Sequence, residues 1–220
     1  MESLRQESKV LAKSKESLIE IRDHLDSARW LVGGPLTESF SLVAASAHLR
    51  LAIEKISLVS FIGHELLTEE DFEATGARKM AEAFKRMKAV NPDFWPRPIV
   101  LQKKEGMGLP RKLRFVYLKG GVTEEEASKM WGELSANLHA YSKARKGASD
   151  REKLINVART GEEIQGLLQM FVISNSATDM TLIGSLKGDD VGMSWIKFGR
   201  LSPEGGDVIG YVDDVLHSTD

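Results

Sequence analysis

The stretch SLVAASAHLRLAIEKISLVSFIG, from Ser41 to Gly63, decides the fold class that we expect for this chain. Drawn as a helix, it is apolar around most of its circumference, and several of its residues are small. A helix with so little polar surface is buried by neighbouring helices on several sides. We therefore expect a helix from about Thr37 to Glu65 at the centre of a helical bundle.

The segment before this helix carries a narrow apolar stripe. Its leucines recur every seven residues, with small or apolar residues between them at helical offsets, giving Leu4, Leu11, Ser14, Leu18, Ile21, Leu25 and Ala28. This spacing predicts a helix of about 28 residues that packs on one side. The helix should end at Gly33, Gly34 and Pro35, because glycine and proline interrupt helices.

Three capping signals predict the starts of three further helices. They are Thr68 with Asp71, Thr123 with Glu126, and Ser149 with Glu152. In each pair a hydroxyl residue precedes an acid by three positions, the spacing at which both side chains cap backbone amides. The first of these helices continues through Phe72, Met80, Phe84 and Met87, and the last through Leu154, Val157, Ile164, Leu168 and Phe171 or Val172. The chain is thus expected to be mainly helical up to about Asn175.

Two segments interrupt this helical pattern. Residues 91–121 contain four prolines and the β-like run LRFVYL, so they read as a long excursion with one strand. Near the C-terminus, MTLIGSL and VGMSWIKFGRL flank the turn Lys187 to Asp190, which predicts a β-hairpin. An isolated hairpin is marginal in water, so this one should lean on the bundle, pair with LRFVYL or meet another chain.

The expected fold is therefore mainly α. It is a helical bundle of about five helices with a long basic excursion and a C-terminal β-hairpin. Residues 1–175 should form the bundle, including the excursion, and residues 176–220 the hairpin and an acidic tail packed on it.

Composition narrows the class of protein. The chain has 42% apolar and 28% charged residues, typical of a soluble globular protein, and no apolar run approaches the ~18 residues of a membrane span. The charged N-terminal segment lacks the apolar core of a signal peptide, so we expect a cytoplasmic location. The absence of cysteine excludes disulfides, thiolate nucleophiles and cysteine-ligated metal centres.

Positive charge is concentrated between Arg97 and Lys119, which holds seven basic residues and the single acid Glu105. The expected nucleic-acid-binding residues are Lys103, Lys104, Arg111, Lys112 and Lys119 for phosphates, with Trp95 and Tyr117 for stacking on bases. Alternatively, this is a solvated basic segment whose aromatic residues anchor it to the bundle. The acids after Pro203 could rest on the basic segment or repel phosphate near it.

A single histidine stands within WGELSANLHAYSKAR, from Trp131 to Arg145. Ala127, Trp131, Leu134, Leu138 and Tyr141 form a bulky stripe, whereas His139 shares a second line with Ser128, Gly132, Ser135 and Ser142. This second line, the small-residue seam, is either a tightly packed helix contact or a groove or dimer interface. In the second case His139 is placed to act as a general base or acid.

These two helices resemble parts of HEPN domains. SAHLRLAIEKISLVSFIG is similar to the family's second helix, with its alanine-rich stretch followed by a Glu-Lys pair, and SANLHAYSKAR resembles the C-terminal helix pair. Nuclease members carry an arginine, four to six residues and then a histidine, and two protomers build a metal-free RNase site. His139 matches that histidine. No basic residue occupies positions 133–135, so Arg50 or Arg114 would have to supply the arginine.

The leading hypothesis is a cytoplasmic HEPN-like protein that forms a homodimer and binds RNA or a protein partner. Metal-independent RNA cleavage, as in toxin or defence systems, is a possible activity, with His139 as base or acid and Arg50 or Arg114 at the phosphate. Arg50 has an alternative role, an ion pair with Glu54. No cofactor, metal site or membrane partner is expected. The rival is a non-catalytic oligomeric interaction module built on the leucine stripe and the C-terminal hairpin.

Overall fold

The computed structural model describes residues 2–62, 80–104, 112–139, 149–174, 180–187, 190–202 and 205–212. The helices are α1 (Glu2–Gly33), α2 (Glu38–Ile62), α4 (Met80–Val90), α5 (Glu124–Leu138) and α6 (Asp150–Leu168). The strands are β1 (Arg97–Lys104), β2 (Lys112–Tyr117), β3 (Phe171–Ser174), β4 (Met180–Lys187), β5 (Asp190–Ser202) and β6 (Gly205–Val212). The described chain is mainly helical, as predicted.

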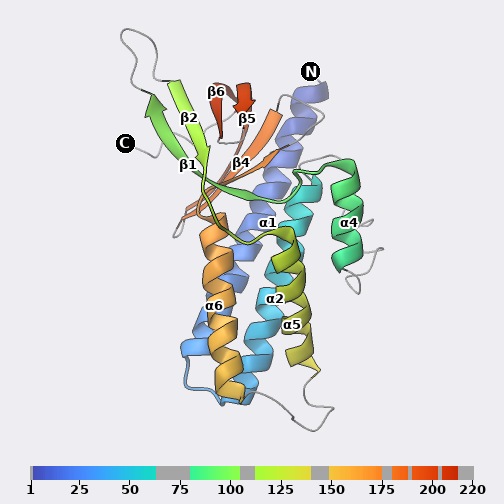
Figure 1. Ribbon diagram of the computed structural model, residues 1–220, viewed down its shortest axis with the longest axis vertical. Coiled ribbons are helices and arrows are strands. Elements are labelled where there is room, and N and C mark those ends of the chain that lie inside the picture. The colour runs from blue at the N-terminus through green and yellow to red at the C-terminus, as the bar shows by residue number, and fades with distance from the viewer. Residues whose placement is uncertain are drawn as a thin grey trace.

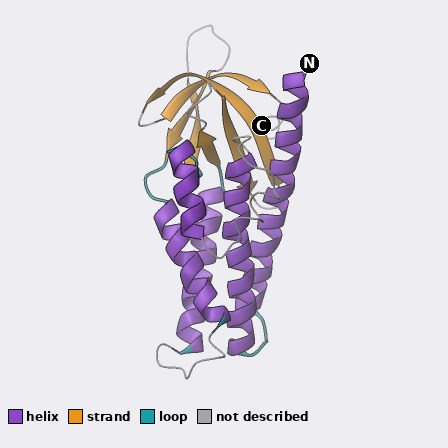
Figure 2. Ribbon diagram, turned by 90° about the vertical axis from the view of Figure 1, so that its right-hand side faces the viewer, coloured by secondary structure: helices purple, strands orange, loops and turns teal. Residues whose placement is uncertain are grey.

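The helices run along the long axis of the molecule, and the sheet covers one end of them (Figure 1). The second view shows the strands above the helix ends, with the N-terminal part of α1 rising beside them (Figure 2). Helix α2 contacts each of the other described helices, and Ala45, Leu49, Ala52 and Ile53 on it are buried. The predicted central position of this helix is confirmed, because its residues are apolar on most sides.

Helix α1 uses its leucine stripe inside the chain. Leu11, Leu18 and Leu25 are buried, together with the intervening Ser14, Ile21 and Ala28. The helix packs on α2, α6 and β5. The leucines therefore contribute to this protein's own core, and the expectation that they assemble an oligomer is wrong for these three residues. The side chain of Leu4 lies outside the described part of the chain.

The described strands form one closed antiparallel sheet in the order β1-β2-β6-β5-β4-β3, with β3 pairing back onto β1. Two predictions need correction here. The basic excursion contributes two strands, β1 and β2, instead of one. Phe171 and Val172 belong to β3 and do not extend the stripe of α6, because both sides of this strand are buried and its backbone pairs with β1 and β4.

The C-terminal hairpin is confirmed as the β4–β5 pair, and β6 adds to it. Strand β6 pairs with β2, which puts Asp207 opposite Arg114 in the register. This part of the acidic segment thus rests on the basic segment, whereas residues 213–220 lie outside the described chain. Because β1 to β3 precede residue 175 and β4 to β6 follow it, the expected boundary there cuts through a single sheet.

The closed sheet has two packed faces. Phe171, Ile173, Leu182, Leu186 and Met193 join the core that the helices form. Ile99, Phe115, Val172 and Ile183 make a second cluster, against which Leu101 and Tyr117 pack. Alternate residues of β3 and β4 thus enter different clusters, as side chains of successive strand residues point to opposite faces. No described helix has an apolar stretch long enough to cross a membrane.

Candidate functional site

His139 lies at the C-terminal end of α5. The predicted capping box at Thr123 and Glu126 starts this helix, which ends at Leu138. The backbone N–H of His139 donates to the carbonyl oxygen of Ala136 at 3.3 Å, and the residue is exposed. The expected continuation through Tyr141 falls outside the described residues. His139 therefore stands at a helix end, and not in the middle of one.

The small-residue seam is only partly exposed where it is described: Gly132 and His139 are exposed, whereas Ser128 and Ser135 are half-buried. On the bulky stripe, Ala127 and Leu134 are buried and Trp131 is half-buried. On the seam, Gly132 is exposed, and a Cβ atom built there would meet nothing within 4 Å. The bulky stripe supplies the buried residues of this helix, so the interpretation of the seam as a packed helix contact fails at Gly132 and His139. Its use at a groove or dimer interface stays a prediction.

Arg50 is held by two neighbours at the contact between α2 and α5. Its Nε atom donates to Oε1 of Glu54 at 2.9 Å, as the alternative interpretation predicted, and its guanidinium lies 4.6 Å from the ring centroid of Trp131. The indole Nε1 of Trp131 donates to the same Oε1 at 2.8 Å. The Glu54 side chain is only 14% exposed, so this carboxylate binds the guanidinium and the indole where little solvent reaches it.

Glu54→Ala is expected to lower the free energy of unfolding by about 2 kcal/mol, because the variant leaves Arg50 and Trp131 without their shared acceptor. Glu54→Gln should recover part of this loss, since its amide oxygen still accepts hydrogen bonds. Urea unfolding followed by far-ultraviolet circular dichroism measures both variants. The control is Glu133→Ala, which removes an exposed carboxylate 3.9 Å from Lys129 and should cost little. Equal losses in the two alanine variants would contradict the shared-acceptor role.

The three predicted catalytic residues do not converge within the chain. Trp131, which holds the Arg50 guanidinium, precedes His139 by eight residues, or roughly 12 Å along a helix at 1.5 Å per residue. Arg114 lies on β2, at the sheet end, whereas α5 runs away from the sheet toward His139 (Figure 1). The expected pairing of His139 with either arginine is therefore wrong for a single protomer.

The basic residues are gathered on the two-stranded ribbon β1–β2, called the basic ribbon from here on. The register pairs Lys104 with Lys112, Lys103 with Leu113, and Gln102 with Arg114. Lys119 follows β2 and is exposed. Arg111 lies outside the described residues. Antiparallel pairing thus brings charges from both strands within a few rungs of one another, which linear sequence alone did not show.

The two aromatic residues expected to stack on bases make contacts inside the chain instead. Trp95 is buried, and its indole Nε1 donates to the carbonyl oxygen of Val122 at 2.7 Å. Its assignment to base stacking is wrong, because the ring packs against Phe84 in the core. Tyr117 is half-buried. The Arg97 guanidinium lies 3.6 Å from its ring centroid, so one face of this ring is covered. Both aromatics therefore anchor the segment, as the alternative interpretation predicted.

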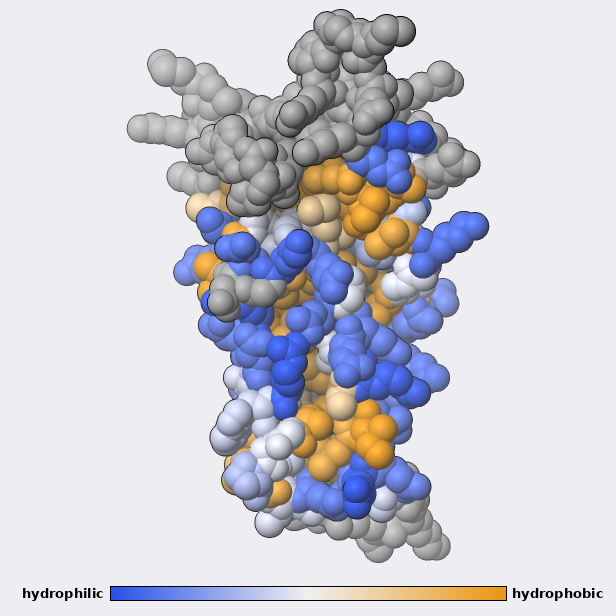
Figure 3. Space-filling view, turned by 90° about the vertical axis from the view of Figure 1, so that its left-hand side faces the viewer, coloured by the Kyte–Doolittle hydropathy of each residue, from blue (hydrophilic) through white to orange (hydrophobic). Residues whose placement is uncertain are grey.

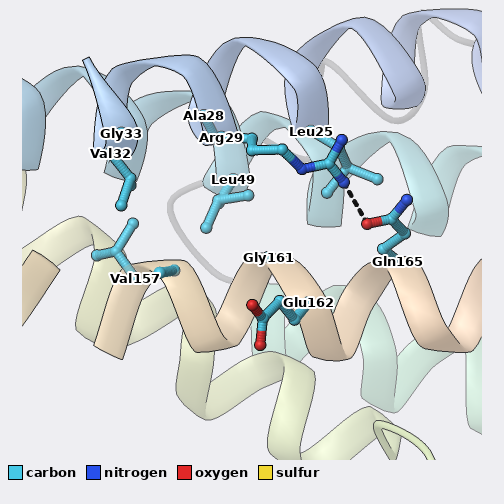
Figure 4. A pocket seen from close by; sticks show the side chains of 11 residues that line it. Leu25, Ala28, Arg29, Val32, Gly33, Leu49, Val157, Gly161, Glu162 and Gln165 are labelled. Atoms are coloured by element: carbon cyan, nitrogen blue, oxygen red, sulfur yellow. Dashed lines mark hydrogen bonds between the residues drawn. The ribbon is translucent and has the colours of Figure 1, made fainter. Parts of the chain in front are cut away.

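A cavity of about 290 Å³ lies between α1, α2 and α6. Its apolar walls include Leu25, Ala28, Val32, Leu49, Val157 and Gly161. Figure 4 shows the Arg29 side chain crossing to Gln165, whose amide oxygen accepts a hydrogen bond from it, while Glu162 points away from α1. The small residues at positions 28 and 161 make this space, and nothing in their spacing predicted it.

The face of the molecule that carries α1 and α6 is hydrophilic in its middle, with apolar patches toward both ends of its described part (Figure 3). At the end away from the sheet, exposed large side chains come from the last turn of α1, the start of α2 and the start of α6. They are Trp30, Phe40 and Ile155. These residues, unlike the leucine stripe, are available to another molecule.

Two histidines that the sequence analysis did not connect meet between α1 and α2. The Nδ1 atoms of His24 and His48 lie 3.0 Å apart, and both rings are half-buried. Within the described chain, no group of three or more histidine or acidic side chains is arranged to hold a metal ion.

Comparison with known proteins does not identify this arrangement. The HEPN resemblance accordingly stays a prediction based on the quoted motifs. No protein-family model, curated protein or solved structure matches the chain.

Proposed function

We propose that the protein binds RNA through the basic ribbon, by contacts to phosphate groups. The observation that supports this proposal most is the β1–β2 register, which pairs Lys104 with Lys112 at one rung of the ribbon, next to the rung of Lys103. Lysines act on phosphate as point charges, and neutralised phosphates release counterions, which drives binding. Seven basic residues stand against one acid between Arg97 and Lys119, so this segment attracts polyanions.

The proposed contacts read the RNA backbone and not the bases. Trp95 and Phe115 are buried, and Arg97 covers one face of the half-buried Tyr117, so these rings offer little surface for stacking on a base. Phosphate contacts position a protein without reading sequence. We therefore expect binding that depends steeply on salt and little on sequence. Arg114 contributes less than the lysines, because the register sets Asp207 opposite it.

Lys104→Gln with Lys112→Gln is expected to weaken binding to a short unstructured RNA by roughly tenfold or more at low salt. The reason is the loss of two phosphate contacts. For single strands each contact contributes ~0.7 to the slope of log K against log salt, so the slope should fall by ~1.4. Fluorescence anisotropy with end-labelled RNA over a salt series measures both quantities.

The matched control for this test is Lys85→Gln with Lys129→Gln, which removes two exposed lysines from α4 and α5. It changes the net charge equally and should leave affinity and slope close to wild type. If the control weakens binding as much as the ribbon variant, the attraction is general and the ribbon is not the site. RNA of different sequences should bind with similar affinity.

RNA cleavage is a separate part of the proposal, and the same complexes test it. Because Arg50 and Arg114 lie away from His139, a cleavage site would need groups from a second protomer. Incubation of RNA with a chelator, comparing wild type with His139→Ala, gives the answer. Cleavage by wild type alone would support His139 as base or acid. Intact RNA with both proteins would sink the nuclease proposal and leave the binding proposal standing.

A further inference from the structure

We infer that His24 and His48 form a contact between α1 and α2 that weakens in acid. This contact between the two rings is called the joint from here on. One histidine comes from each helix, and the two Nδ1 atoms lie 3.0 Å apart, within hydrogen-bond distance. The ring centroids are 5.3 Å apart, and the rings are tilted by 50°, so each ring is held at the helix contact by the other.

This contact requires a particular protonation state. Of two neighbouring imidazole nitrogens, one must carry the hydrogen and donate, and the other must accept with its lone pair. A neutral pair satisfies this condition, and so does a pair with one proton added. When both rings are protonated, each Nδ1 is a donor and both rings are positive, so the hydrogen bond becomes a repulsion at the same distance. The joint therefore holds at neutral pH and opposes the fold in acid.

Charged neighbours do not reverse this conclusion. Within the described residues, the charged groups that act on His24 are Glu20 and Asp23 of α1 and Lys55 and His48 of α2. Glu20 is paired with Lys55 at 2.6 Å. Asp23 is paired with Arg22 at 3.3 Å. Both carboxylates that would favour a protonated His24 are thus already balanced by cations.

Burial and the nearby His48 lower the pKa of His24 below its ordinary value of 6.5, against the opposing effect of Glu20. A histidine whose pKa is lowered by folding binds protons more readily in the unfolded chain. As pH falls through about 6.5, the unfolded state takes up the proton first and stability begins to fall. The loss is complete once pH lies below the pKa of the folded state.

The position of the two histidines indicates that acid lowers stability around the α1–α2 contact as well as in the whole fold. Leu25 and Leu49, the residues that follow the two histidines, line the cavity between α1, α2 and α6 (Figure 4). Repulsion between the rings therefore separates helices at the wall of this cavity. Amide hydrogen exchange near the pair should accelerate in acid, after correction for the intrinsic rate, more than exchange in α5.

A double-mutant cycle tests the joint. His24→Gln, His48→Gln and the double variant are unfolded with urea at about pH 7.5 and about pH 5.5, where histidine changes its charge. The coupling between the two positions should be favourable at the higher pH and weaker at the lower one, where pairs with both rings protonated begin to form. Between these two pH values the unfolding constant of wild type should rise by up to about tenfold more than that of His24→Gln, because the unfolded chain takes up one more proton across the pH unit below 6.5.

A titration of the wild-type imidazole signals by nuclear magnetic resonance covers the case in which a variant does not fold. It should give His24 an apparent pKa below 6.5 and a signal shape that reports coupling to His48. A His24 pKa at or above 6.5, or identical pH dependence of stability in wild type and His24→Gln, would overturn the inference.

Discussion

Gly184→Val is expected to lower the free energy of unfolding by about 3 kcal/mol or more, the upper range for overpacking a core. A Cβ atom at position 184 would lie 2.2 Å from Cζ of Phe171 and 2.8 Å from Sδ of Met193. The register sets these residues on either side of Gly184, on β3 and β5, and both are buried. Both side chains belong to the core that the helices form, so neither can move away without colliding with other core residues. Guanidinium unfolding monitored by circular dichroism measures the loss.

Two further variants show whether the loss of stability comes from the contact of the new side chain with Phe171 and Met193. Gly132→Ala is the control, because position 132 is exposed on α5 with nothing within 4 Å of a new Cβ atom. It should stabilise the protein by roughly 0.5 to 1 kcal/mol, the helix preference for alanine over glycine. Combining Gly184→Ala with Phe171→Leu should cost less than the sum of the single changes, since the smaller ring partner leaves space. Additive losses would argue against a direct contact.

Leu18→Ala is expected to cost about 2 to 5 kcal/mol, the range for leucine removed from a packed core. Leu18 is fully buried where α1 packs in the chain's own core. The loss should not depend on protein concentration, because the contacts are intramolecular. Thermal unfolding at several concentrations tests this. An oligomer held together by the leucine stripe would instead show a midpoint that rises with concentration.

The neighbouring residue provides the matched control. Ile19 is 37% exposed on the same turn of α1, so Ile19→Ala should cost much less than Leu18→Ala. Comparable losses would mean that α1 is packed on a different face. Association of this protein, if observed, should then be traced to exposed residues such as Trp30 and Phe40, which are not part of the core.

Local signals in the sequence predicted the local structure well. The capping boxes at Thr123 and Ser149 start α5 and α6, with both reciprocal hydrogen bonds formed. The third predicted signal, Thr68 with Asp71, lies outside the described residues. The bonds of each capping box join residues three positions apart, so the information needed to predict them is contiguous. The pairing of β4 with β5 was predictable for the same reason, because its first rung joins Lys187 and Asp190. The prediction failed at β3, which pairs with the distant strand β1. There the apolar stripe predicted for α6 was extended too far, to Phe171 or Val172.

In the candidate site, too, the features that depend on nearby residues were predicted and those that depend on distant contacts were not. Charge alone identified the basic segment, and the register then placed its lysines on a ribbon. The sequence could not show that Trp95 is buried, because its burial depends on Val122 and Phe84. It also treated His24 and His48 as unrelated, although the antiparallel packing of α1 on α2 puts their rings together.

The sequence by itself determined that the chain is mainly helical, which helix is central and where the positive charge lies, since each follows from residue types at short spacing. Only the tertiary structure decided that the excursion and the C-terminal strands close one sheet. It also decided that the leucine stripe is internal, that His139 stands apart from Arg50 and Arg114, and that two histidines meet. Each of these depends on residues brought together across many intervening positions, a choice made by the packing of the whole core and not by any local preference.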